Sequence, residues 1–231
     1  RMIYTVPDFQ NPTGVTLSLE RRKALIALAN QHDLIVLEDT PYRHIRFAGQ
    51  HLPTLKSLDT EGRVIHLGSF SKVLVPGLRL GWALAAPGLL ARMGQLKVAA
   101  DTQTSTLNMA AASLFLDRYD LDAHIATLRT AYAAKKEVML DAIRQHFPQD
   151  IVATDPQGGL FTWLTFPDGF DATDFMRHVA LPQARVAYVP GATFFPLTPR
   201  ANHARLNFSS PSADAIRTGI AALGRALHVH P

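Results

Sequence analysis

Residues 67–87 read LGSFSKVLVPGLRLGWALAAP, a mostly apolar stretch that nevertheless holds two cations, Lys72 and Arg79. The runs RVIHLGSF at 63–70 and LRLGWALA at 78–85 are short and apolar, which is typical of strands. Proline and glycine between the two runs indicate a turn. The stretch therefore predicts two strands, with Lys72 just after the end of the first and Arg79 at the start of the second.

The chain on the N-terminal side of this stretch alternates strand and helix. MIYTV at 2–6 and LIVLED at 34–39 predict strands, and the second, a continuous apolar run that ends in acids, is typical of a buried parallel strand. Residues 19–32 repeat apolar side chains at helical spacing after Ser18, a good N-cap residue. This order indicates an α/β sheet, in which ligands bind at the carboxyl ends of the strands.

The C-terminal half begins with three helical patterns and then changes in character. Helices are expected at 87–100, 105–116 and 121–147. After Pro148 the chain shows short strands at 158–166, 185–189 and 204–209, and helices at 172–179 and 212–227. Short strands with two helices indicate an α+β unit. We therefore expect three parts, which are an α/β domain at 1–120, a long connecting helix at 121–147 and a small domain at 148–231.

Composition limits the function classes. The 231 residues are 47% hydrophobic, enough for a core, and no apolar run is long enough to span a bilayer. The absence of cysteine excludes disulfides and cysteine nucleophiles, and it fits a reducing cytosol without demanding one. The histidines show no useful metal-ligand spacing, so no metal is expected.

The net charge of +4 does not indicate nucleic-acid binding, because the basic residues are scattered. The basic groups at 21–23 and 135–136 fall in helical patterns, and we expect them to face solvent. A few well-placed cations are better suited to a small anionic ligand.

Two polar clusters precede the opening stretch. Asn11 in QNPTG suits the first position of a type I turn, and taken alone this turn is the preferred interpretation. Asp39 in LEDTPY directly follows a predicted strand, so it either caps the next turn or lies at the mouth of the sheet as a carboxylate paired with a cation. Tyr42 could point at the same space.

Two more clusters carry cations. Lys72 is either a solvated surface lysine or, in apolar surroundings, a nucleophilic amine. Ser69, Ser71 and the turn backbone offer donors to an anion, and Arg79 adds a charged fork. Arg205 in ARLNFS is either an edge charge or a bidentate clamp for a carboxylate.

One ligand would use all of these groups. A nucleophilic Lys72 would react with a carbonyl group, and the serines with Arg79 would bind a phosphate. Asp39 would pair with a cationic ring. Pyridoxal phosphate carries all three, and its enzymes pair a lysine with an acidic partner of the ring nitrogen.

The motifs NPTG, EDTPY, GSFSKVLVPGLRLGW and ARLNFS, in this order, resemble those of fold-type I pyridoxal-phosphate-dependent aminotransferases of class I/II, over the whole chain. The likeness extends to the branch that contains 2-aminoadipate and kynurenine aminotransferases. It implies the C-terminal part of the large cofactor-binding domain, with a mostly parallel sheet and helices, followed by a small α+β domain. It also implies a cytoplasmic homodimer that moves an amino group between an amino acid and a 2-oxo acid, with no nucleic acid or membrane as partner.

The resemblance implies roles at the cofactor ring. Lys72 would hold the cofactor through its amine and then move the proton between the substrate and the cofactor. Asp39 would keep the pyridine nitrogen protonated. Asn11 and Tyr42 would donate hydrogen bonds to the ring oxygen, with Tyr42 acting beside Lys72 and Asp39 as a catalytic residue.

The resemblance also implies roles for the remaining polar residues. Ser69, Ser71 and Arg79 would bind the phosphate of the cofactor. Arg205 would hold the α-carboxylate of the substrate, with Asn11 beside it.

Members of this family are similar in having a longer N-terminal part, with a phosphate loop and an aromatic ring that stacks on the cofactor. Because nothing precedes Arg1 in this sequence, we expect an N-terminally truncated chain that on its own binds the cofactor poorly and does not turn over. Three alternatives stay open. The first is another pyridoxal-phosphate reaction that uses the same Lys72 and Asp39, such as that of a lyase, decarboxylase or racemase. The second is the effector-sensing domain of a bacterial transcriptional regulator. The third is a non-catalytic fragment.

Overall fold

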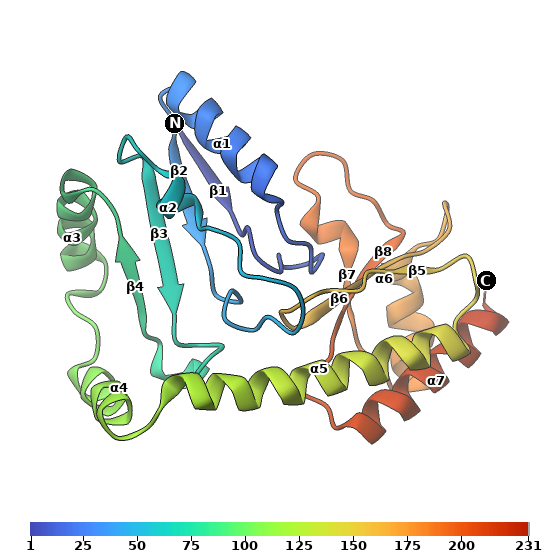
Figure 1. Cartoon of the computed structure of the whole chain (residues 1–231). Coiled ribbons are helices and arrows are strands. Elements are labelled where there is room, and N and C mark those ends of the chain that lie inside the picture. The colour runs from blue at the N-terminus through green and yellow to red at the C-terminus, as the bar shows by residue number, and fades with distance from the viewer. Residues whose placement is uncertain (231) are drawn as a thin grey trace. The chain divides into compact units, whose positions relative to one another are not determined.

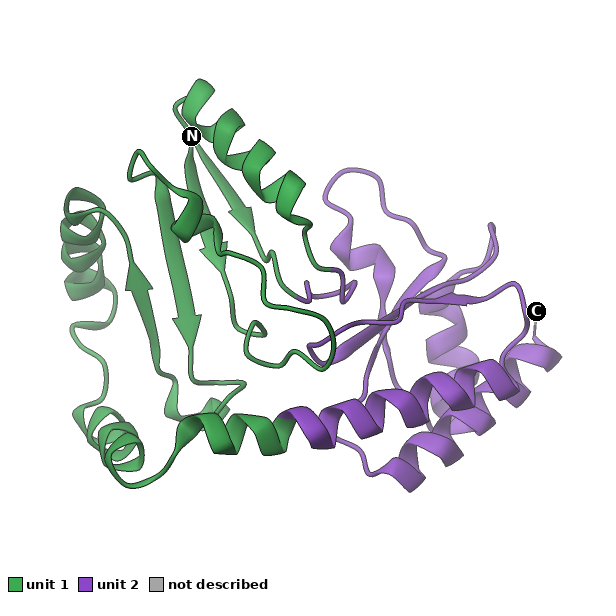
Figure 2. Ribbon diagram, in the orientation of Figure 1, with its two compact units in different colours: residues 1–8, 16–128 green, residues 9–15, 129–231 purple. Residues whose placement is uncertain are grey.

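A computed structural model describes residues 1–230. These residues form two compact units (Figure 2). Unit 1 comprises Arg1–Asp8 and Thr16–Leu128, and unit 2 comprises Phe9–Val15 and Arg129–Pro231. None of the helices within 1–230 is long and apolar enough to cross a membrane.

Unit 1 is an α/β unit whose four-stranded sheet has the order β1-β2-β3-β4 (Figure 1). Its strands are β1 (Met2–Thr5), β2 (Ile35–Asp39), β3 (Val64–Ser69) and β4 (Gly81–Leu84). The first three strands are parallel, and β4 joins β3 in the antiparallel direction. Its helices are α1 (Leu19–Gln31), α2 (Leu55–Leu58), a 3₁₀ turn (Pro76–Leu78), α3 (Pro87–Asp101) and α4 (Thr106–Arg118). The expected α/β class with a mostly parallel sheet is confirmed.

Helix α1 covers one face of this sheet. The Ser18 hydroxyl caps it by accepting a hydrogen bond from the Arg21 amide at 3.3 Å, as the sequence predicts. Ile26 and Ala29 of α1 then pack on Val36 and Val64, and Leu55 of α2 completes this core. Burial of this apolar layer holds the helix on the parallel strands.

Arg22 corrects the expectation that the basic group at 21–23 faces solvent, because its side chain is fully buried. Spacing of four and seven residues puts Arg22 on the same helical face as Ile26 and Ala29. Its guanidinium pairs with Asp8 at 2.7 Å and donates to the carbonyl of Pro53 at 2.9 Å. The local pattern could not show this partner, which lies 14 residues away on another segment.

Strand alternation separates two kinds of residue across the sheet of unit 1. Val36 and Glu38 project to the face covered by α1 and α2, and Glu38 is fully buried. Tyr4 and Asp39 project to the opposite face, where Tyr4 is 58% exposed. The Asp39 carboxylate, which is the candidate site residue, thus lies on the more open face of the sheet.

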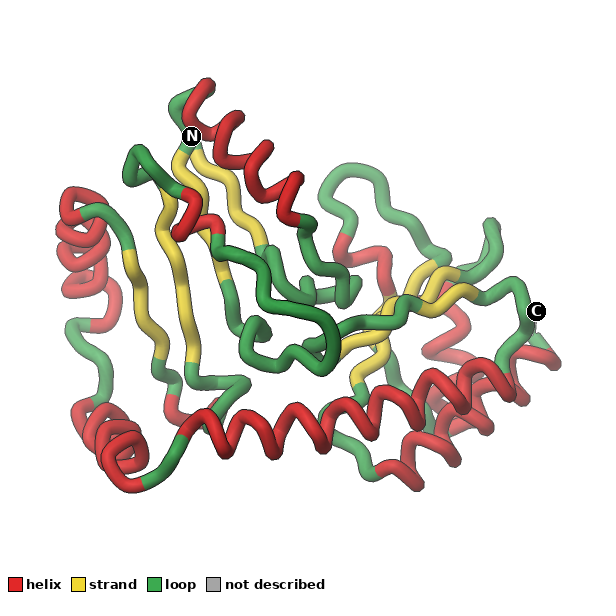
Figure 3. Tube along the Cα trace, in the orientation of Figure 1, coloured by secondary structure: helices red, strands yellow, loops and turns green. Residues whose placement is uncertain are grey.

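Unit 2 is an α+β unit with an antiparallel sheet of order β5-β6-β8-β7. Its strands are β5 (Val152–Ala153), β6 (Phe161–Thr165), β7 (Val189–Pro190) and β8 (His203–Asn207). Its helices are the larger part of α5 (Leu121–His146), α6 (Ala172–Phe175), a π-helical segment (Met176–Ala184), a 3₁₀ turn (Gly191–Phe194) and α7 (Ala213–Val229). Figure 3 separates the helices, strands and loops of both units.

One predicted strand of unit 2 is shorter in the structure than expected. The strand predicted at 185–189 is reduced to the pair Val189–Pro190, because a π-helical segment continues to Ala184 and Arg185 adopts a left-handed conformation with φ of 55°. Proline at position 190 has no N–H group for the ladder, so the strand stays short.

Lys136 is the second basic residue that we expected to face solvent and that proves to be buried. Its side chain is only 10% exposed. Its ammonium pairs with Asp155 at 2.7 Å and with Glu137 at 2.8 Å. Carboxylates from two segments thus compensate the buried charge of Lys136, which the helical pattern alone predicted to face solvent.

The NPTG loop is wound more widely than a type I turn. The amide of Gly14 donates to the carbonyl of Gln10 at 2.7 Å, not to that of Asn11, and the Asn11–Pro12 peptide bond is cis. Gly14 has φ of 71°, and a Cβ atom there would lie 2.8 Å from the carbonyl oxygen of Phe161. Only glycine suits this position, because both the backbone conformation and the close packing exclude a side chain.

Candidate active site

The carboxyl ends of β2 and β3 meet at one edge of the parallel sheet. Asp39 is the last residue of β2 and Ser69 the last of β3. The register pairs Asp39 with Leu67, so Ser69 lies two residues further along the neighbouring strand. Lys72 follows in the next turn, half-buried. Parallel sheets bind ligands at this edge.

The loop from Phe70 to Leu80 is closed at its base. Ser69 pairs with Gly81 across the β3–β4 ladder, and the Phe70 amide donates to the Leu80 carbonyl at 3.2 Å. The antiparallel β4, which starts later than the predicted strand at 78–85, therefore turns the chain back on itself. Residues close to the two ends of the loop lie near each other for this reason.

Three of the predicted phosphate and cofactor residues lie on this loop. The Ser71 amide donates to the Ser69 hydroxyl at 3.1 Å, which gives the start of the loop a tight turn. Arg79, at the opposite end, has a left-handed backbone, and its exposed guanidinium donates to the Pro76 carbonyl at 3.4 Å. Lys72 lies between Ser71 and Arg79 in the chain, so an amine, hydroxyls and a guanidinium share one loop.

Asp39 has a defined hydrogen-bond partner. The Tyr4 hydroxyl donates to its Oδ2 at 2.7 Å. Burial raises the pKa of the Tyr4 hydroxyl, and the hydrogen bond and negative charge of Asp39 raise it further. Tyr42, in the turn after β2, is buried, and its carbonyl accepts the Ile45 amide at 2.8 Å.

A buried carboxylate beside Asp39 was missed in the sequence. Glu38 is fully buried and accepts the amides of Leu55 and Lys56 at 2.7 and 3.0 Å, and its Oε2 lies 2.8 Å from Nδ1 of His66. A buried carboxylate needs several donors, and α2 and β3 provide them. The available signal was an acid at a core-facing position of an otherwise apolar strand.

Unit 2 brings together the two predicted substrate residues. Nη1 of Arg205, on β8, donates to Oδ1 of Asn11 at 2.6 Å across 194 residues of sequence. The guanidinium carbon of Arg205 lies 4.4 Å from the centroid of the Phe161 ring and 5.5 Å from that of Phe194. Stacking of this kind orients an arginine and shields one face from water.

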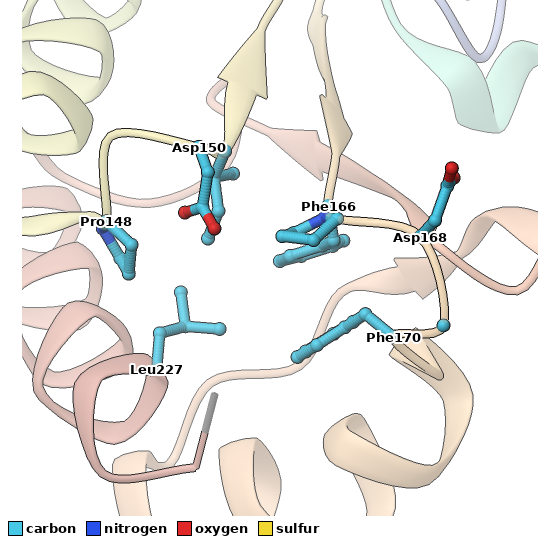
Figure 4. A pocket seen from close by; sticks show the side chains of 9 residues that line it. Pro148, Asp150, Phe166, Asp168, Phe170 and Leu227 are labelled. Carbon is cyan, nitrogen blue, oxygen red and sulfur yellow. The ribbon is translucent and has the colours of Figure 1, made fainter.

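A cavity elsewhere in unit 2 contains none of the predicted residues. It has a volume of about 400 Å³, and its wall includes Phe166, Phe170 and Leu227. Figure 4 shows the Asp150 carboxylate directed into this space and the Asp168 carboxylate directed away from it. Because none of the predicted site residues line this cavity, we do not assign the predicted chemistry to it.

Comparison with known proteins decides the family. The sequence profile of the aminotransferase class I and II family matches residues 5–223. The chain belongs to this family. The class I/II likeness inferred from the four motifs is thereby confirmed.

Curated relatives of this family member include enzymes. It is 40% identical to aromatic-amino-acid aminotransferase 1 of Thermococcus litoralis, over 98% of this chain and 54% of the relative. It is 37% identical to 2-aminoadipate transaminase of Thermus thermophilus, over 98% of this chain and 57% of the relative. The chain thus spans about half the length of the curated relatives it matches.

A solved structure matches the family member along its length. The crystal structure of Pyrococcus horikoshii kynurenine aminotransferase, in complex with PMP and kynurenine, superposes with a TM-score of 0.95 at 40% identity. The alignment covers 99% of this chain and 56% of that chain. The fold of both units therefore has a close counterpart among solved aminotransferases.

The family member is also similar to a regulator. It shares 37% identity with the HTH-type transcriptional regulator TauR of Rhodobacter capsulatus, over 98% of this chain and 46% of the regulator. Family membership is therefore compatible with more than one function, and the site chemistry must decide between them.

Proposed function

We propose that the protein to which this chain belongs transfers an amino group between an amino acid and a 2-oxo acid with pyridoxal phosphate as its cofactor. The observation that carries this proposal is the end of β3 with the loop that follows it, where Ser69, Ser71, the amine of Lys72 and the guanidinium of Arg79 lie near the carboxylate that ends β2. Few ligands need these groups together, and pyridoxal phosphate needs all of them.

The donor set of unit 1 fits the cofactor group by group. Ser69, Ser71 and Arg79 offer hydroxyl, amide and guanidinium donors to a phosphate dianion. Asp39 offers a carboxylate oxygen to a protonated ring nitrogen, and the resulting pair keeps that nitrogen charged. Tyr42, three residues further on, would donate to the ring oxygen. When bound, pyridoxal phosphate supplies an electron sink for the bond that breaks at the substrate α-carbon.

Lys72 has two proposed tasks. Its amine would hold the cofactor at the carbonyl carbon, with release of water, until the amino group of the substrate takes its place. The freed amine would then act as a general base and acid that moves a proton between the substrate α-carbon and the former carbonyl carbon of the cofactor. A half-buried position suits both tasks, because it limits hydration of the amine.

Arg205 and Asn11 of unit 2 are proposed to bind the α-carboxylate of the substrate. The guanidinium can form two parallel hydrogen bonds to a carboxylate, and its stacking on Phe161 restricts its orientation. Asn11 accepts from Arg205 through Oδ1, so its Nδ2 group keeps its capacity to donate, and we assign that donor to the substrate carboxylate.

The regulator similarity supports a second candidate, an effector-sensing domain that binds the cofactor without turnover. The segment that precedes Arg1 in the gene distinguishes the two, because a DNA-binding helix-turn-helix there would favour the regulator. A lyase or decarboxylase reaction on the same residues is distinguished by its products. A homodimer, a cytoplasmic location and the absence of a nucleic-acid partner stay predictions.

The test uses the protein at its natural length. We expect a visible absorption band on addition of pyridoxal phosphate, and borohydride reduction should leave the mass of the cofactor on the Lys72 peptide. A panel of amino acids with 2-oxoglutarate should then give glutamate. Binding without any glutamate would favour the regulator, and labelling of another lysine would contradict the Lys72 assignment.

A further inference from the structure

We propose that Tyr4 is a positioning residue that holds one oxygen of the Asp39 carboxylate and leaves the other directed at the ring nitrogen of the cofactor. This inference rests on the proposed function for the role of Asp39. It adds a residue from β1, outside every motif that the sequence singles out.

The register of the parallel strands makes the contact possible. Tyr4 on β1 pairs with Leu37 on β2, and Asp39 follows two residues later on the same face of the sheet. The long tyrosine side chain spans this offset, and its hydroxyl reaches Oδ2 of Asp39 at 2.7 Å. That distance is typical of an O–H donor bound to a carboxylate.

The backbone on both sides of Asp39 is already held by β3. The preceding residue, Glu38, accepts hydrogen bonds through its carboxylate from the amides at the start of α2, and the same carboxylate lies within hydrogen-bond distance of His66 on β3. Thr40, after it, donates to the Leu67 carbonyl through its amide at 3.1 Å and through its hydroxyl at 2.8 Å. The main freedom left to Asp39 is rotation of its side chain, and the hydrogen bond from Tyr4 restricts that rotation.

The protonation states suit this role. Burial and the neighbouring charge of Asp39 raise the pKa of Tyr4, so the hydroxyl keeps its proton and stays a donor at neutral pH. A hydrogen bond donated to the charged form of a carboxylate stabilises that form. A charged Asp39 in turn favours a protonated ring nitrogen, as the proposed reaction requires.

The test is Tyr4→Phe, which removes one oxygen from a side chain that is 58% exposed and should leave the fold intact. Tyr119→Phe is the matched control, because Tyr119 is 63% exposed and belongs to the same unit. In the cofactor-free protein at neutral pH, the carboxyl NMR signal of Asp39 should change position in Tyr4→Phe and should stay in place in Tyr119→Phe. The dissociation constant for pyridoxal phosphate should rise about three- to tenfold, as expected for the loss of one hydrogen bond of ordinary strength that acts on the cofactor through Asp39.

A double-mutant cycle with Asp39→Asn provides an independent measurement. If Tyr4 acts through Asp39, Tyr4→Phe should change cofactor affinity much less in the Asp39→Asn background than in the wild type. An unchanged Asp39 carboxyl NMR signal in Tyr4→Phe, or equal effects on cofactor affinity in both backgrounds, would overturn the inference. Failure of every form to bind the cofactor would instead overturn the proposed function and, with it, the positioning role of Tyr4, while the NMR signal would still report the contact itself.

Discussion

The β3–β4 loop of unit 1 and the Asn11–Arg205 pair of unit 2 are assembled in opposite ways. The loop carries Lys72 and Arg79 seven positions apart, and a single antiparallel turn places them. The pair joins residues 194 positions apart and depends on the NPTG loop belonging to unit 2. Local sequence can encode the first arrangement, whereas the second exists only once a sheet has formed.

The largest expected effect is on the loop. Lys72→Ala should lower kcat by roughly a thousandfold or more, because both the attachment and the proton transfer are lost. Steady-state kinetics on the natural-length protein measure this loss. Lys97→Ala, on exposed α3, should leave kcat unchanged. Substantial turnover by Lys72→Ala would contradict the proposal that Lys72 attaches to the cofactor and transfers the proton.

The stability of unit 1 provides the next test. Arg22→Met leaves Asp8 as a buried charge without its nearest partner, and we expect a loss of about 3–5 kcal/mol in the free energy of unfolding. Urea denaturation measures it. Arg63→Met removes a more exposed ion pair with Glu61 and should cost about 0–1 kcal/mol. Equal losses in the two variants would mean that the buried pair does not hold this end of the unit.

The pair in unit 2 is tested by Arg205→Lys, which keeps the charge and removes the planar fork. We expect KM for the amino acid to rise about tenfold to a hundredfold with a smaller change in kcat, since the carboxylate contact exists before the chemistry begins. Arg200→Lys, outside the β8 strand, is the control. A pure loss of kcat would indicate that Arg205 acts on the reacting atoms rather than on the carboxylate.

The smallest expected effect concerns acid stability at Asp59 in unit 1. Burial alone would raise the pKa of this carboxyl, but hydrogen bonds from Lys56 and from the amides of Val64 and Arg63 outweigh it and hold the pKa at about 2. A lowered pKa means that the contribution is complete above about pH 4 and is lost as pH falls towards 2.

Asp59→Asn should therefore destabilise unit 1 by about 2 kcal/mol at pH 7 and by progressively less between pH 4 and 2. Denaturation at several pH values measures this dependence. A loss that stays constant across the whole range would show that packing, and not the charge of Asp59, is responsible.

Local patterns predicted the elements well and their edges less well. The α1 helix with its Ser18 cap and α5 follow from apolar residues at helical spacing, and the three parallel strands follow from short apolar runs, which neighbouring residues determine by themselves. The strand predicted at 185–189 formed only as Val189–Pro190, because a π-helical segment extends to Ala184 and only these two residues pair with the distant β8. The NPTG turn was wider than predicted because the Gly14 amide binds the carbonyl of Gln10, one residue before Asn11, while Gly14 packs closely against the Phe161 carbonyl of another segment.

What the sequence by itself determined is the identity and order of the groups that carry the proposed chemistry. The motifs around Asp39 and Lys72 specify a carboxylate and an amine that follow neighbouring strands, and short-range rules suffice to place them at one edge of a sheet. These groups also identify the family without reference to the fold.

Only the tertiary structure decided the partners of these groups. It buried Arg22 against Asp8, tied Glu38 to His66, brought Arg205 to Asn11 and placed the Tyr4 hydroxyl on Asp39. Each of these contacts joins segments that are separate in the chain, and each depends on strand register or helix packing. A carboxylate or guanidinium in a sequence carries its charge with it, but the partner that compensates its burial is set by the fold.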